Sequence, residues 1–253
     1  MKLKKQSLKG LQGGQVRIIT ISSLKGGVGK TTLSAFLSLA LASRGKVLAV
    51  DFDANNNLTD FFAREIDDET IENSNAYHFL TKKKTAEQCI IKGLFSDFMP
   101  GALSLHRLTA EMLHRPNALL SVKSLFPVGY DFIIIDTAPA LDWSTFAGIY
   151  AADIVLSPVN FSRWTIQAAR LLSDEISQIQ QAPELKLVPS IVTEKEKENL
   201  LNFPGITKAA IHKSAAIRTA SNKAQRLKDS QKSFLDFEEL ADEIIKGAGN
   251  GDK

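Results

Sequence analysis

The stretch Ser23-Leu24-Lys25-Gly26-Gly27-Val28-Gly29-Lys30-Thr31-Thr32 decides the fold of this chain. It lies between an apolar, strand-like run at residues 18–21 and a helix-like run that begins near Thr31. A glycine-rich loop that leads from a strand into a helix leaves backbone N–H groups unpaired, and these groups point toward one spot. The helix dipole adds positive potential there. The stretch therefore predicts a phosphate-binding loop.

Two side chains of this loop have a predicted role in binding a nucleotide. Lys30 supplies a positive charge for the β- and γ-phosphates, and the Thr31 hydroxyl is placed to ligate Mg²⁺. The loop departs from the usual pattern G-x-x-x-x-G-K-[ST] at its first glycine, because residue 24 is leucine. A second lysine, Lys25, precedes the glycine pair instead. The whole binding set is Lys25, Gly26, Gly27, Val28, Gly29, Lys30, Thr31 and Thr32.

Composition excludes several classes of protein. The chain has 253 residues and a single cysteine, Cys89, so neither an internal disulfide framework nor a cysteine metal cluster is possible within it. It has no run of 18 apolar residues, and no apolar segment of a signal peptide follows the lysines near residue 1. We therefore expect a cytoplasmic protein that does not associate with membranes.

Charge is distributed unevenly, although the net charge is only +3. No acidic residue precedes Asp51, whereas the same segment carries nine lysines and arginines. A second acid-free stretch spans residues 199–228. Its basic residues are Lys208, Lys213, Arg218, Lys223, Arg226 and Lys228. This asymmetry predicts a polyanionic partner.

Apolar strand-like runs alternate with helical ones along the chain. Strands are expected at residues 16–22, 46–51, 130–136, 154–159 and 185–193, with a weaker candidate at 103–108. Near-continuous apolar strands separated by helices predict an α/β fold, a doubly wound and mostly parallel sheet flanked by helices. We expect residues 1–15 to form a flexible basic arm and residues 16–253 to form a single phosphate-loop domain. Residues 61–102 read as helices and loops at the sheet edge.

Three carboxylates follow predicted strands. Asp136 closes the apolar run at 133–135, and Asp51 and Asp53 end the strand at 46–51. Because ligand-binding and catalytic residues of parallel sheets lie at the carboxyl ends of the strands, these residues should lie beside the phosphate-binding loop. A carboxylate in the position of Asp136 holds Mg²⁺, often through water, which is the Walker B arrangement.

The run Lys-Gly-Gly-Val-Gly-Lys-Thr-Thr resembles the deviant Walker A loop of the ParA/MinD ATPase family. Residues 50–53 and 131–139 extend the resemblance, which covers about residues 16–246 and is nearest to ParA/Soj partition ATPases. It implies binding of ATP and Mg²⁺ and hydrolysis of ATP. By position, Asp53 would orient the attacking water, and Asp51 would be structural or contact the waters of the magnesium ion. Lys25 would reach the phosphates bound by a second subunit.

The resemblance implies a catalytic set of Lys25, Lys30 and Asp53 and a metal set of Thr31, Asp53 and Asp136. One departure concerns the segment after Asp53, where the family usually has Pro-Gln-Gly-Asn and this chain has Ala-Asn-Asn-Asn at residues 54–57. The carboxylate of Asp53 is unaffected by this change. How the segment at residues 54–57 works in this chain is left open.

The same resemblance implies a cycle of DNA segregation in the cytoplasm, on the nucleoid. ATP joins two copies of the chain, the dimer binds DNA without sequence preference, and a ParB-like centromere-binding protein stimulates hydrolysis and release. Cations without competing carboxylates suit the contact with phosphates. Within the second acid-free stretch, Lys213 and Arg218 are the first candidates for DNA binding, followed by Lys223 and Arg226.

Other functions remain open at this point. A MinD-like positioning ATPase needs a basic amphipathic C-terminal helix, whereas the predicted helix at 233–246 is rich in Asp and Glu. A nitrogenase iron-protein type needs cysteines for a shared cluster. A metabolic ATP-dependent ligase of the dethiobiotin synthetase type would use the same loop with a small-molecule carboxylate pocket. A nucleotide-gated scaffold with negligible turnover is a further alternative.

Overall fold

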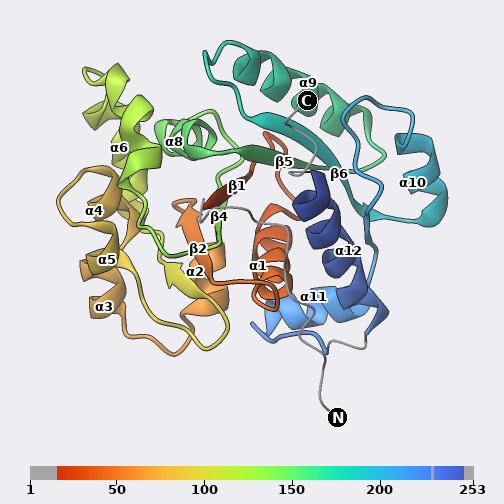
Figure 1. Cartoon of the computed structure of the whole chain (residues 1–253), viewed down its shortest axis with the longest axis horizontal. Coiled ribbons are helices and arrows are strands. Elements are labelled where there is room, and N and C mark those ends of the chain that lie inside the picture. Colours follow the sequence, from red (N-terminus) through yellow and green to blue (C-terminus); the bar gives the residue numbers. More distant parts are fainter. Residues whose placement is uncertain (1–15, 229–230, 248–253) are drawn as a thin grey trace.

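The computed structural model describes residues 16–228 and 231–247, which form one sheet with helices on both faces (Figure 1). The sheet has seven strands in the order β3-β2-β4-β1-β5-β6-β7, and neighbouring strands pair in parallel. The strands are β1 (Arg17–Ile21), β2 (Val47–Phe52), β3 (Asp97–Met99), β4 (Phe132–Thr137), β5 (Ile154–Val159), β6 (Glu184–Val192) and β7 (Ile211–His212). The predicted α/β fold is therefore confirmed.

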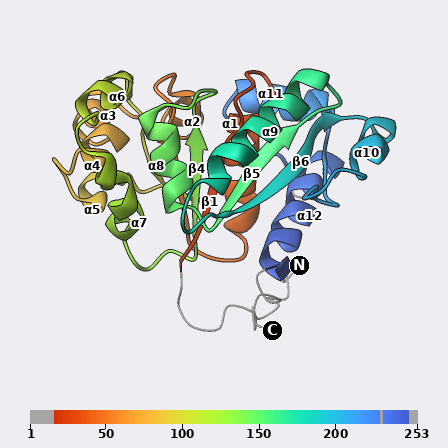
Figure 2. The ribbon, with the colours of Figure 1, turned by 90° about the horizontal axis from the view of Figure 1, so that it is seen from above.

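The helices divide into two layers, one on each face of the sheet, and Figures 1 and 2 show them in two perpendicular views. One layer contains α1 (Lys30–Leu41), α2 (Asn57–Phe62), α11 (Ala215–Asn222) and α12 (Lys232–Gly247). The other face is covered by α4 (Ala76–Leu80), α6 (Leu108–Glu111), α7 (Val122–Leu125), α8 (Trp143–Ala151) and α9 (Arg163–Ser177). Around these lie α3 (Asp68–Asn73), α5 (Ala86–Cys89), α10 (Glu194–Leu200) and the 3-10 helices η1 (Leu103–Arg107) and η2 (Pro116–Ser121).

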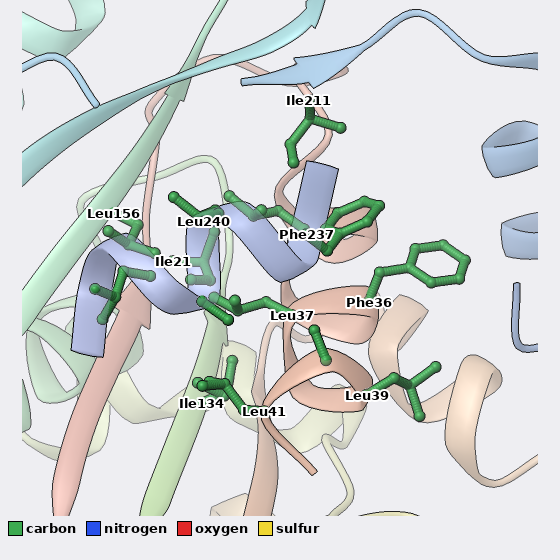
Figure 3. Close-up of a cluster of buried hydrophobic side chains, with 14 of the residues drawn as sticks. Ile21, Phe36, Leu37, Leu39, Leu41, Ile134, Leu156, Ile211, Phe237 and Leu240 are labelled. Atoms are coloured by element: carbon green, nitrogen blue, oxygen red, sulfur yellow. The ribbon is translucent and has the colours of Figure 1, made fainter. Parts of the chain in front are cut away.

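The core under α1 and α12 fixes the position of the phosphate-binding loop. Phe36 and Leu37 of α1 meet Phe237 and Leu240 of α12 above the sheet (Figure 3). All four side chains are buried, and the rings of Phe36 and Phe237 lie 5.2 Å apart between centroids. Burying an aromatic or leucine side chain contributes about 1.5–3 kcal/mol. The first helix after the loop is thus anchored along one whole face.

The strand register brings the phosphate-binding loop and the two carboxylate-bearing segments to the same end of the strands. Strand β1 lies between β4 and β5, and Ile21 is in register with Asp136. Asp136 is in turn in register with Asp51 on β2. The loop that follows Ile21 and the two carboxylates therefore lie in one row, as the sequence predicted.

Two elements differ from the sequence-based expectation. The strand expected at 103–108 is wrong, because these residues form η1 and the start of α6. Leu105, Leu108 and Met112 are buried and follow helical rather than alternating spacing. Residues 61–102 contain the expected helices but also the edge strand β3. The expected arm at 1–15 lies outside the described residues.

Candidate nucleotide-binding site

The loop between β1 and α1 has the backbone of an anion-binding site. Gly27 and Gly29 adopt left-handed backbone conformations, with φ of 75° and 90°. Gly29 is the N-cap of α1, and among the described residues the start of this helix has no side-chain cap hydrogen bond. These donors and the positive end of the helix dipole face the same place, where they suit a phosphate group. The glycines at 27 and 29 are required because other residues adopt this conformation only at a cost.

Lys30 is placed for a buried phosphate. The residue is buried at the start of α1, and its Nζ donates to the Lys25 carbonyl oxygen over 3.5 Å. Burial lowers the pKa of the Lys30 ammonium, and the nearby Asp136 and Asp53 carboxylates oppose this shift. A phosphate at the loop would supply the negative charge and the hydrogen-bond acceptors that this ammonium has in water.

Thr31 and Asp136 meet at the end of β4. Thr31 Oγ1 donates a hydrogen bond of 2.7 Å to Asp136 Oδ2, and Ser34 Oγ donates one of 2.7 Å to Oδ1. Burial raises the pKa of Asp136 to about 6, against the effect of these two hydrogen bonds. A hydroxyl beside a carboxylate is a set of hard oxygen donors, the kind that Mg²⁺ prefers. The residues present therefore fit a magnesium ion at this point.

Asp51 is held entirely by neighbouring protein groups. Its Oδ2 accepts hydrogen bonds from the Thr59 backbone N–H and hydroxyl, at 2.9 and 2.8 Å, and its Oδ1 accepts one from the Asp53 N–H at 3.0 Å. Burial, followed by the Asp136 carboxylate, raises the pKa of Asp51 to about 8. Asp51 thus fixes the start of the segment that carries Asp53.

Asp53 lies at the same edge and is almost fully buried, with 4% of its surface exposed. Its Oδ1 accepts hydrogen bonds of 2.9 Å from both the backbone N–H and the side-chain amide of Asn55. Its charge is close enough to Lys30 and Asp136 to affect the pKa of both. Asn55 therefore orients this carboxylate, although it stands in the segment that departs from the family pattern.

The sequence did not single out the residues that support this segment. Thr59 contacts Asp51, and its hydroxyl also accepts a hydrogen bond of 2.8 Å from the Gly101 N–H. A Cβ on Gly101 would lie 2.7 Å from Asn56 Oδ1 and 3.0 Å from the Asp53 carbonyl oxygen. The sequence also did not single out Ser34, which binds Asp136 and follows Thr31 by about one helical turn.

Lys25 differs from Lys30 in its surroundings. It is exposed, and its N–H donates to Ser23 Oγ over 3.4 Å. Within residues 16–228 and 231–247, no carboxylate lies within ion-pair distance of the Lys25 ammonium. The Lys25 ammonium is therefore available to bind a negatively charged group outside its own loop.

A cavity of about 450 Å³ lies between the phosphate-binding loop and α11. Its wall includes Gly29 and Thr32 from the loop and first helix, and Thr32 Oγ1 lies 3.5 Å from Ser221 Oγ of α11. Ile191 and His212 line it from the ends of β6 and β7. Its position next to the last glycine of the loop suits the nucleoside part of a nucleotide.

The four predicted DNA-binding residues are not equivalent in the structure. Lys213 forms an ion pair of 3.0 Å with Glu196, and the Arg226 guanidinium stacks on Phe95, 4.9 Å from the ring centroid. Arg218 and Lys223 are exposed on and after α11. Arg218 also lines the cavity beside the loop. In the part of the chain that the structure describes, no helix is long and apolar enough to cross a membrane.

Known proteins share both the sequence pattern and the fold. The AAA_31 family model, an AAA domain, matches residues 16–188. The chain is 29% identical over 195 residues to the chromosome-partitioning ATPase Soj of Thermus thermophilus, and the match covers 74% of this chain and 73% of that protein. It is 32% identical over 163 residues to a probable plasmid-partitioning protein ParA of the same species. That match covers 62% of this chain and 49% of the relative.

Solved structures agree with this fold. A plasmid partition protein from Borrelia burgdorferi bound to AMPPNP has a TM-score of 0.83 and 22% identity, over 92% of this chain and 100% of that one. Cobyrinic acid a,c-diamide synthase from Mycobacterium smegmatis, with a bound ATP analogue and magnesium, has a TM-score of 0.79 and 22% identity, over 94% and 98%. The chain belongs to the ParA/Soj family of P-loop ATPases.

Proposed function

We propose that this chain is a DNA-partition ATPase that dimerises on ATP, binds DNA without sequence preference, and is released by partner-stimulated hydrolysis. The observation that carries the proposal is the contrast between two lysines of one loop. Lys30 is buried near Asp136 and Asp53, whereas Lys25 is exposed and its ammonium has no carboxylate within ion-pair distance among the described residues. One lysine therefore suits the phosphates of its own subunit, and the other suits those of a partner.

The chemistry at one subunit follows from the geometry at the sheet edge. The loop N–H groups and Lys30 would hold the phosphates, and Thr31 and Asp136, which share a hydrogen bond, would hold Mg²⁺. Mg²⁺, when bound, neutralises charge that develops on the phosphate oxygens. Asp53, oriented by Asn55, would fix the attacking water. Hydrolysis would then be accelerated by positioning of the water and the phosphates and by electrostatic stabilisation of the transition state, as in other phosphoryl transfers.

Dimerisation would complete the site. A lysine supplied in trans acts like an arginine finger, because it adds positive charge where the transferred phosphoryl group becomes more negative. Lys25 is suited to this role since its ammonium has no carboxylate partner among the described residues. ATP would thus join two copies of the chain face to face, and hydrolysis would separate them.

DNA binding is proposed for the surface around α11. Arg218 and Lys223 present exposed cations there, and Lys213 becomes available if its pair with Glu196 opens. Cations that contact only phosphates give binding that is independent of sequence and depends steeply on salt. Because Arg218 also lines the cavity beside the loop, nucleotide binding and DNA binding would share one element. We propose that the ATP-bound protein is cytoplasmic and associates with the nucleoid.

Two alternatives receive less support. A MinD-like membrane anchor would need a free amphipathic C-terminal helix, but the apolar side of α12 is buried against α1. A ligase would need a basic pocket for a small carboxylate substrate. The cavity of about 570 Å³ beside Thr59 is lined by Asp60, Asp68 and Glu72 with Arg107, so its charge is unfavourable for such a substrate.

Co-sedimentation with random duplex DNA tests the proposal. Measured with ATP, ADP or no nucleotide, the wild-type chain should pellet with DNA only in the presence of ATP, and light scattering should show a dimer under the same condition. Lys30→Gln is the matched control, because it should lose both effects by losing nucleotide. DNA binding that is the same in all three states, or a monomer throughout, would overturn the proposal.

A further inference from the structure

Ile191 has an unusual backbone conformation at the end of β6. Its φ is 57°, in the left-handed region, although it is neither glycine nor asparagine. A β-branched residue adopts this conformation only with strain, because its side chain crowds the backbone. The strain coincides with a register shift between Ser190 and Val192, where the pairing of β6 with β7 is irregular. Strained residues of this kind are concentrated at functional sites.

The bulge brings Ile191 against the phosphate-binding loop. A Cβ built on Gly29 would lie 3.3 Å from Ile191 Cδ1, 3.6 Å from its Cγ1 and 3.1 Å from Ser190 Oγ. Gly29 has a φ of 90° and caps α1, and its carbonyl oxygen accepts the first hydrogen bond of that helix, from the Leu33 N–H over 2.8 Å. The backbone of Gly29 therefore sets the direction of the first N–H groups of α1, and Ile191 covers its outer side.

Burial of the Ile191 side chain compensates the strain only in part. Ile191 is 38% exposed, so its side chain is buried less completely than those of the core. Val192, one residue later, is fully buried and accepts a backbone hydrogen bond of 2.9 Å from the Lys213 N–H. The pairing of β6 with β7 thus resumes at Val192, after the bulge. The left-handed conformation of Ile191 brings its side chain into contact with Gly29.

We propose that Ile191 is a positioning residue for the phosphate-binding loop. Its left-handed backbone holds the side chain against Gly29, and this contact keeps the glycine in the conformation that directs the N–H groups of α1 toward a phosphate. The inference rests on the proposed function only in assuming that the loop binds the phosphates of ATP. It assigns Ile191 an effect on phosphate binding that does not require a nucleobase.

The test compares two probes and three variants by calorimetry in the presence of Mg²⁺. The probes are ATP and inorganic tripolyphosphate, which has no base or ribose. Ile191→Gly removes the side chain and tolerates a positive φ. Ile191→Leu retains an apolar side chain long enough to reach Gly29. Lys82→Gly is the matched control, because Lys82 also has a positive φ, of 58°, but lies on an exposed turn after α4.

Ile191→Gly should bind ATP and tripolyphosphate about ten-fold more weakly than the wild type while unfolding at the same or a higher temperature. Ile191→Leu should recover most of the affinity, and Lys82→Gly should bind both probes normally. Unchanged affinity in Ile191→Gly would overturn the inference. So would a loss restricted to ATP, which would indicate a base contact, or a loss accompanied by a lower unfolding temperature. A wild-type chain that binds neither probe would overturn the proposed function itself.

Discussion

Thr31 Oγ1 lies 2.7 Å from Asp136 Oδ2, although 105 positions separate the two residues in the sequence. The contact joins the first turn of α1 to the end of β4, and Ser34 Oγ binds the other oxygen of the same carboxylate. Both hydroxyls donate, so the carboxylate is oriented before any ligand arrives. Preorganisation of this kind is what a metal-assisted phosphoryl transfer requires.

Asp136→Asn should lower the rate of ATP hydrolysis by on the order of 10²-fold, because an amide keeps the shape of the side chain but loses the charge that would hold Mg²⁺ in the proposed site. Steady-state phosphate release at saturating Mg²⁺-ATP measures this effect. Ser34→Ala is the control, since it removes one hydrogen bond to Asp136 and leaves the charge in place, and it should cost only a few-fold. Wild-type turnover in Asp136→Asn would show that this carboxylate is not the metal ligand.

Lys25→Gln should abolish ATP-dependent dimerisation while the monomer still binds ATP. The reason is that, in the proposed dimer, the exposed ammonium of Lys25 would serve the phosphates of the second subunit, whereas the buried Lys30 would serve those of its own. Light scattering with ATP measures the association, and calorimetry measures nucleotide binding.

The control for this prediction is Lys30→Gln, which should lose nucleotide binding as well as association. A Lys25→Gln variant that dimerised with ATP and hydrolysed it at the normal rate would contradict the role in trans.

Much of the fold follows from the sequence because its central strands are apolar on both faces and need helices on both sides. The runs that became β2 and β4, with Asp51 and Asp136 at their ends, could be predicted for this reason. The strand β3 could not, because it has only three residues and is formed by pairing with β2 rather than by its own pattern. The run at 103–108 has the apolar residues of a strand, but tertiary packing selects a helical spacing there.

In the candidate site, too, some residues could be predicted from a local sequence pattern, whereas others are set by tertiary contacts. The phosphate-binding loop is a continuous motif, so its residues could be named from the sequence alone. The partners of Asp51 and Lys213 come from segments that no local pattern connects to them, namely Thr59 and Glu196. Ile191 is a further example, because a positive φ in a β-branched residue contradicts local propensity, and this residue lies beside Gly29 of the loop.

Gly101→Ala should slow ATP hydrolysis about ten-fold with little change in nucleotide affinity. The added Cβ would lie 2.7 Å from Asn56 Oδ1 and 3.0 Å from the Asp53 carbonyl oxygen, so the segment that carries the Asp53 carboxylate must shift. The three atoms nearest to the added Cβ belong to Asn56, Asp53 and Asp51, and none of these residues is part of the predicted phosphate-binding loop. Single-turnover hydrolysis and calorimetry separate the two quantities.

A matched control for Gly101→Ala is Gly129→Ala. Gly129 has a φ of 92° but no atom within 4 Å of a built Cβ, so the change strains the backbone without touching Asp53. It should lower stability and leave hydrolysis by the folded protein unchanged. Equal turnover in Gly101→Ala and the wild type would mean that the contact does not position Asp53.

Arg218→Ala combined with Lys223→Ala should weaken the binding of random duplex DNA and reduce the slope of log affinity against log salt by about 2, or about 1 for each lost phosphate contact. Lys213→Ala should have a smaller effect, because the Lys213 ammonium already neutralises Glu196 at 3.0 Å, and contact with DNA would first require that pair to separate. Fluorescence anisotropy over a range of salt concentrations, with ATP present, measures both quantities.

Lys186→Ala is the control, since Lys186 pairs with Glu184 at the opposite end of β6 from Ile191. An unchanged salt slope in the double variant would place the DNA contact on another surface and would leave Arg218 with a role only at the nucleotide cavity.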